Sequence, residues 1–83
     1  MARRTDKAMR EKIVLVEWVD SCEPDPNTDT DEIPEPQTIY QAGFLVRERS
    51  EYITIAGAMK PELGTMDYLI SIPRSAVKQI IRI

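Results

Sequence analysis

The sequence predicts a small, mainly β domain that begins with one short helix. Three observations favour this class: the 83 residues contain several short runs of β-branched and aromatic side chains, only the segment before Ile13 has a helical pattern, and proline- or glycine-containing segments separate the runs. A chain of this length forms one domain, near the size at which a single core becomes marginal, so self-association is expected to add burial. We therefore expect one homo-oligomeric domain.

The elements can be assigned in chain order. Residues 1–12 predict a basic N-terminal helix or tail, and residues 13–83 the single β domain. The run "IVLVEWVD" predicts the first strand, with Val14, Val16 and Trp18 on one face. Trp18 on such a face suits a core anchor, or an aromatic residue of a binding groove.

Residues 20–36 predict a long acidic loop after the first strand. The segment holds four of the six prolines and seven acidic residues. Proline cannot donate a ladder hydrogen bond, so the segment does not suit a strand. A loop this long in a small domain is usually functional or disordered.

The rest of the chain predicts four more strands. "QTIYQAGFLVRERSEYITIAG" suits two strands joined by a tight turn near Ser50, with Phe44 and Val46 alternating against Leu45 and Arg47. A second loop, "AMKPELGTMD", precedes the strand "YLISI"; "PRSAV" then suits one tight helical turn and "KQIIRI" a fifth strand. Gly43 suggests a bulge or bend, and Phe44 and Tyr68 are expected in the core.

This order of elements is typical of a small closed barrel of the SH3-like kind, with the N-terminal helix favouring an Sm-like variant. Closure would remove the exposed strand edges that invite aggregation. An open five-stranded sheet is the structural alternative. Both keep the short N-terminal helix and the long acidic loop in the same places.

Charge is strongly segregated along the chain. Residues 1–12 carry a net +3, residues 13–36 a net −8 and residues 37–83 a net +2. A chain divided in this way can attract a second copy of itself, or offer two differently charged surfaces to partners; the alternative is two solvated segments. One cysteine, Cys22, and the absence of an apolar run of roughly 20 residues favour a cytoplasmic protein without a membrane partner.

Three segments carry a family resemblance: "VEWVDS", "AGFLVRERSEYITIA" and "ISIPRSAVKQI". This pattern, over about residues 14–83, resembles a group of small phage and prophage proteins of unknown function. The resemblance implies a viral accessory protein in the cytoplasm of an infected or lysogenic bacterial host. It brings no catalytic or ligand residues with it.

The side chains available favour binding rather than catalysis. The chain has no histidine and one cysteine, so it lacks the commonest general base and a Cys/His zinc site. The alternating oxygens of "DPNTDTDEIPEP" resemble a calcium loop, but Thr30, Glu32 and Pro36 stand where that loop needs a glycine, an apolar residue and a glutamate. We expect no enzymatic activity, no cofactor and no metal.

Two sets of residues are candidates for binding. In the first set, the acidic loop and nearby aromatic residues would contact a basic peptide or the positive cleft of a host protein, unless the loop only aids solubility. Its members are Trp18, Asp25, Asp29, Asp31, Glu32 and Tyr40. In the second set, basic side chains would pair with phosphate while tyrosine stacks on a base, unless these are ordinary solvent-facing residues. Its members are Arg47, Arg49, Tyr52, Lys60, Arg74 and Ser75.

The leading functional hypothesis is a non-enzymatic phage protein that oligomerises and inhibits a host process such as antiviral defence. It would block a host protein or sequester a small nucleotide signal between subunits. An Sm-like ring that binds RNA is one alternative, and a structural or packaging accessory of the virion is another. Without a strongly positive surface overall, duplex DNA is not an expected partner.

Overall fold

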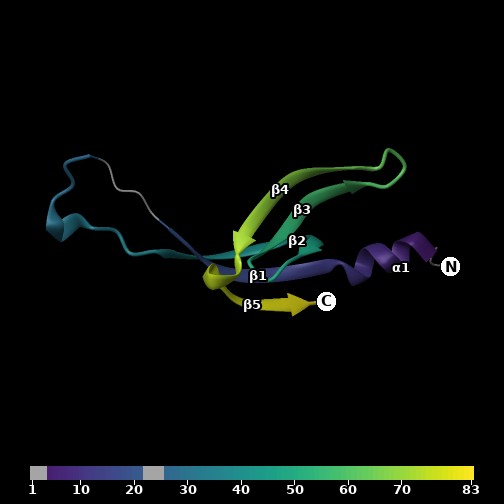
Figure 1. Ribbon diagram of the computed structural model, residues 1–83, viewed down its shortest axis with the longest axis horizontal. Coiled ribbons are helices and arrows are strands. Elements are labelled where there is room, and N and C mark those ends of the chain that lie inside the picture. Colours follow the sequence, from purple (N-terminus) through teal and green to yellow (C-terminus); the bar gives the residue numbers. More distant parts are fainter. Residues whose placement is uncertain (1–3, 22–25) are drawn as a thin grey trace.

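One antiparallel sheet forms most of the molecule. The computed structural model describes residues 4–21 and 26–83, and Figure 1 shows how their elements are arranged. In chain order these are α1 (Arg4–Glu11), β1 (Ile13–Asp20), the 3₁₀ turn η1 (Thr30–Glu32), β2 (Gln37–Glu48), β3 (Tyr52–Lys60), β4 (Thr65–Pro73), the 3₁₀ turn η2 (Arg74–Ala76) and β5 (Val77–Arg82). None of the described helices has the length and hydrophobicity needed to cross a lipid bilayer.

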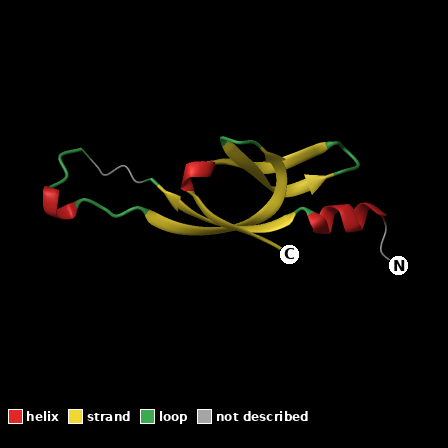
Figure 2. Ribbon diagram, turned by 60° about the horizontal axis from the view of Figure 1, so that its bottom comes forward, coloured by secondary structure: helices red, strands yellow, loops and turns green. Residues whose placement is uncertain are grey.

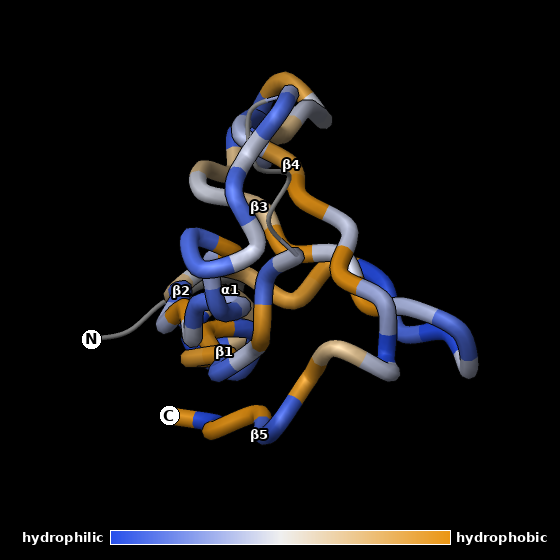
Figure 3. Tube along the Cα trace, turned by 90° about the vertical axis from the view of Figure 1, so that its left-hand side faces the viewer, coloured by the Kyte–Doolittle hydropathy of each residue, from blue (hydrophilic) through white to orange (hydrophobic). Residues whose placement is uncertain are grey.

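The sheet has the strand order β4-β3-β2-β1-β5. Strands β1 to β4 follow one another as a meander, and after η2 the chain returns so that β5 pairs with β1. The predicted mainly β fold, with five strands and a short N-terminal helix, is therefore confirmed. The sheet is not closed: β4 and β5 are its two edges, and they lie far apart in the end-on view of Figure 3. The closed barrel expected from the sequence is therefore not confirmed.

The core forms because the sheet curls over its own apolar face (Figure 2). Val14, Val16 and Trp18 of β1 are buried as their alternation predicts, and they pack with Ile53 and other residues of the neighbouring strands. The remaining buried members are Leu45, Ile55 and Ile72. Most of these side chains are β-branched, which suits the pleated surface of a strand. Phe44, expected in the core, is only half-buried, and Leu45 takes the core position instead.

The segment predicted as a second loop is mostly strand. β3 continues to Lys60 and β4 begins at Thr65, so the connection is a tight turn. In that turn Leu63 N–H donates to Lys60 O at 3.1 Å, and Gly64 adopts a left-handed backbone with φ of 67°. The residues that extend the ladder here, such as the pairs of Ala58 with Asp67 and of Lys60 with Thr65, show no regular alternation of apolar and polar side chains, which explains why the sequence indicated a loop.

The molecule is elongated, with principal extents of 58 × 24 × 24 Å. The connection between β1 and β2 projects from one end of the sheet, and α1 lies at the other end (Figures 1 and 2). This follows from the topology, because α1 precedes the start of β1 and the connection follows its end. We call residues 26–36, the described part of that connection, the acidic arm. Cys22 and Asp25 lie outside the described residues.

Candidate functional site

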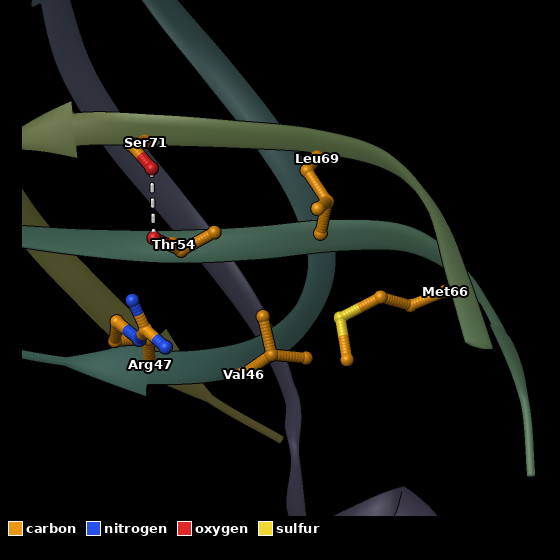
Figure 4. A pocket seen from close by; sticks show the side chains of 6 residues that line it. All are labelled: Val46, Arg47, Thr54, Met66, Leu69 and Ser71. Atoms are coloured by element: carbon orange, nitrogen blue, oxygen red, sulfur yellow. Dashed lines mark hydrogen bonds between the residues drawn. The ribbon is translucent and has the colours of Figure 1, made fainter. Parts of the chain in front are cut away.

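A pocket of about 290 Å³ lies on the part of the sheet formed by β2, β3 and β4 (Figure 4). It occupies the face opposite to the core, because Thr54 of its lining alternates with the core residues Ile53 and Ile55. Its lining consists of Val46, Arg47, Thr54, Met66, Leu69 and Ser71. Of these, Arg47 alone was predicted as a ligand residue.

A β-bulge brings a cation and an apolar side chain together at one wall. Leu45 pairs with Ile55 and Arg47 with Thr54, so Val46 is an extra residue in β2. Regular alternation would put Val46 and Arg47 on opposite faces, as the sequence predicts, but two residues of a bulge face one residue of the partner strand. Both side chains therefore line the pocket. The bulge lies at this point of β2 and not at Gly43, where it was expected.

The opposite wall depends on an irregular backbone in β4. Met66 and Leu69 both line the pocket, although their spacing would place them on opposite faces of a regular strand. Between them Tyr68 has a left-handed φ of 58°, which interrupts the alternation. The expectation that Tyr68 is a core residue is wrong, since its side chain is 82% exposed. A bulky residue with positive φ is a genuine outlier and often marks a functional site.

Two hydroxyl groups form the polar part of the lining. Thr54 Oγ1 and Ser71 Oγ lie 2.8 Å apart and share a hydrogen bond (Figure 4). A signal for this pair exists in the sequence, because "ITI" of β3 and "ISI" of β4 align residue by residue across the ladder. The positions of Val46 and Met66 have no such signal, since they depend on the bulge and on the backbone of Tyr68.

Three of the predicted basic residues and the predicted tyrosine gather around the β2–β3 turn. Arg47 Nη1 donates to Tyr52 Oη at 3.4 Å, which holds the guanidinium at the end of the pocket. Arg74 Nε donates to Arg49 O at 3.0 Å, and the backbone N–H of Arg74 donates to Glu51 O. Arg74 thereby fastens η2 to the turn and is a structural residue as well as a charge.

Acidic side chains reduce the positive charge of this region. Glu48 lies 3.2 Å from Arg82 and 3.7 Å from Arg74. Ser75 is exposed in η2, beside Arg74. Lys60 is not part of the group: it lies at the far end of β3, roughly 26 Å along the strand from Tyr52, and its Nζ is 2.6 Å from Asp67 Oδ2.

The described members of the predicted partner-binding set are divided among the core, the exposed surface of β2 and the acidic arm. Trp18 is 8% exposed and belongs to the core, so it presents almost no surface to a partner. Tyr40 is exposed on β2, with its hydroxyl 3.5 Å from Glu17 Oε2. The acidic members of the set that lie in the arm, Asp29, Asp31 and Glu32, are exposed. Within the described ranges no three Asp, Glu, Cys or His side chains are placed to hold a metal ion.

The groups that line the pocket are suited to noncovalent contacts. Arginine keeps its positive charge at all ordinary pH values and presents a planar fork to carboxylate or phosphate groups. Thr54 and Ser71 can exchange hydrogen bonds with a polar group, while Val46, Leu69 and the flexible Met66 offer apolar contact. None of the six lining residues is a base that would activate either hydroxyl as a nucleophile.

Fold and site together define a small, mainly β protein. Its antiparallel sheet has a pocket on the face opposite to the core, with Arg47 at one end of that pocket. No protein-family model matches the chain, and no curated protein or solved structure is similar enough to match it.

Proposed function

We propose that the protein acts by binding a small anionic molecule with a flat apolar part, of the nucleotide class, in the pocket ended by Arg47. One observation carries the proposal: a guanidinium, a hydroxyl pair and an apolar wall line the same 290 Å³ pocket. This volume lies just below the range typical of small-molecule sites, roughly 300–1,000 Å³, so it suits one nucleotide or part of a larger one.

The roles of the lining follow from its chemistry. Arg47 pairs with a phosphate, and its hydrogen bond to Tyr52 limits the conformations that the side chain must give up on binding. Thr54 and Ser71 meet the sugar hydroxyls. Leu69 and Met66 cover the base, which needs contact area more than directed hydrogen bonds.

Titration with a nucleotide and its nucleoside, followed by calorimetry, tests the proposal. Wild-type protein is expected to prefer the nucleotide, and Arg47→Ala to bind both with similar, weak affinity because only the phosphate contact is lost. Arg82→Ala is the control, since this exposed arginine also belongs to the sheet but pairs with Glu48 and lies outside the pocket lining. Absence of nucleotide binding by the wild type, or equal losses in both variants, would contradict the proposal.

The SH3-like identity of the fold is part of the same proposal. The meander of four strands, the 3₁₀ turn η2 between β4 and β5, and the return of β5 to β1 support it. The viral origin and the inhibition of a host defence rest on the resemblance of residues 14–83 alone. In that context the protein would lower the free concentration of a nucleotide signal.

An RNA-binding role is less well supported. Arg49 and Arg74 lie near Arg47, but Glu48 and Glu51 occupy the same turn, and Glu48 lies near two of the arginines of the region. Extended RNA binding requires a continuous positive surface. Binding of single-stranded RNA oligonucleotides in preference to mononucleotides would overturn the small-ligand proposal in favour of this one.

A further inference from the structure

The acidic arm presents one large apolar side chain among carboxylates. Ile33 is 66% exposed and directly follows Asp31 and Glu32, which are also exposed. η1 holds this tip in a turn, because Glu32 N–H donates to Asp29 O at 2.9 Å. A single exposed apolar side chain is common on protein surfaces, but one that is bordered by carboxylates on a projecting turn has the shape and charge to enter an apolar pocket with a basic rim.

A pocket with the opposite character lies at the other end of the molecule. It measures about 410 Å³ and lies between α1 and the C-terminal residue, and we call it the helix pocket. Its lining consists of Lys7, Arg10, Glu11, Ile13 and Ile83. The backbone N–H of Ile83 donates to Ile13 O at 3.3 Å, which sets these two apolar side chains beside the basic helix. Neither Lys7 nor Arg10 forms an ion pair with a described residue.

The two features match in polarity and charge. The apolar side chain of Ile33 is complementary to the apolar part of the helix pocket. The negative charges of Asp31 and Glu32 are complementary to the positive charges of Lys7 and Arg10. Among the lining residues that the structure describes, the basic side chains of Lys7 and Arg10 stand against one acidic side chain, that of Glu11. Opposite potentials on two surfaces steer their encounter and fix their register.

The arm cannot reach the helix pocket of its own chain. β1 separates them, and its eight residues span roughly 26 Å at about 3.3 Å per residue. The arm points away from the sheet on the side opposite to α1 (Figure 1). The complementary surfaces therefore meet only between two chains.

We propose that the acidic arm of one copy docks in the helix pocket of a second copy, with Ile33 as the buried residue and Asp31 and Glu32 facing Lys7 and Arg10. The contact is heterologous, since it joins two different surfaces, and repeats head to tail until it closes into a ring or continues as a chain. It does not depend on the ligand pocket, so Arg47→Ala leaves it intact. Because the interface is small and charged, association is weak and falls with ionic strength.

Complementation between two variants tests this arrangement by sedimentation velocity. Ile33→Asp removes the knob, and the double variant K7E/R10E reverses the charge of the pocket; each alone is expected to sediment as a monomer. A mixture of the two retains one intact arm and one intact pocket, and is expected to form a 1:1 dimer but nothing larger. Formation of this dimer also shows that both variants are folded.

Leu63→Asp is the matched control, because Leu63 is 74% exposed on the β3–β4 turn and has no place in the contact. It is expected to associate like the wild type. At about 0.05 M salt the wild type is expected to form either one closed ring or oligomers whose size grows with protein concentration, and at about 0.5 M salt these oligomers are expected to dissociate. Three results would overturn the proposal: a wild type that stays monomeric at all concentrations, oligomers that survive both variants, or a mixture that remains monomeric. The third result would leave the arm free for another protein.

Discussion

A Cβ atom placed on Gly57 would lie 3.0 Å from the Cβ of Tyr68 on the neighbouring strand. This distance is shorter than almost all real contacts between such atoms, so Gly57 makes room for the left-handed backbone of Tyr68. The conformation of Tyr68 thus depends on the absence of a side chain at Gly57. This conformation interrupts the alternation of side-chain direction in β4 beside the ligand pocket.

Gly57→Ala is expected to lower the free energy of unfolding by about 1–2 kcal/mol in the wild-type background, because the new methyl group crowds Tyr68. In a Tyr68→Gly background the same change is expected to cost much less. Chemical denaturation of the four proteins of this cycle measures the coupling. Equal costs of Gly57→Ala in both backgrounds would show that the two positions act independently.

Gly43 is required by a close approach of two backbones. Its Cβ would lie 2.8 Å from the carbonyl oxygen of Ala56, which is held in the β2–β3 ladder. We expect Gly43→Ala to destabilise the protein by about 1–3 kcal/mol, since the strands must move apart. Gly64→Asn serves as the comparison: space around Gly64 is open and asparagine tolerates the left-handed region, so its cost is about 1 kcal/mol or less. Thermal unfolding measures the loss of stability in both variants, and a larger loss in Gly64→Asn than in Gly43→Ala would contradict this prediction.

Trp18 combines good packing with an unsatisfied polar atom. Its Nε1–H is buried and has no hydrogen-bond partner among the described residues. An unpaired buried donor costs about 1–3 kcal/mol, so Trp18→Phe is expected to cost about 1 kcal/mol or less despite the loss of volume. Trp18→Ala, which removes the packing as well, is expected to cost about 3–5 kcal/mol. Urea denaturation followed by circular dichroism compares them, and a cost of Trp18→Phe close to that of Trp18→Ala would contradict the prediction, because removal of the unpaired donor would then bring no compensation.

The hydrogen bond between Thr54 and Ser71 contributes to stability as a pair. Thr54→Val keeps the shape and removes the bond, at an expected cost of about 1 kcal/mol. Ser71→Ala removes the same bond, so the double variant is expected to cost little more than either single one. Strictly additive losses in equilibrium denaturation would indicate that each hydroxyl has a different partner. In the ligand titration the double variant is expected to bind the nucleoside more weakly than the wild type does.

Much of the fold could be predicted because apolar alternation fixes which face of a strand is buried. The run around Val14 indicated the correct strand and its core side, the run around Ile53 indicated another correct strand, and the tight turn near Ser50 followed from its position between two such runs. The charged ladder near Lys60 was taken for a loop because its pairing depends on the left-handed Gly64 and not on hydrophobicity.

The candidate site was predictable only in part. Arg47 and Tyr52 were identified from their charge and aromatic character, and the structure joins them by a hydrogen bond. Lys60 was grouped with them on residue type alone, whereas the length of β3 separates it from Tyr52. Met66 was not identified, since its place in the pocket depends on an irregular backbone that has no local pattern.

The sequence by itself determined the strand-forming segments, the apolar face of the first strand, and the separation of an acidic segment from a basic one. These are local properties, set by side-chain chemistry and by the twofold periodicity of extended chains. Tertiary structure decided which face of β2 receives Arg47, which residues share its pocket, and that the acidic arm and α1 lie at opposite ends of the molecule. Those relationships depend on the bulge, on the backbone of Tyr68 and on the order of strands, because pairing between distant segments fixes side-chain direction in space.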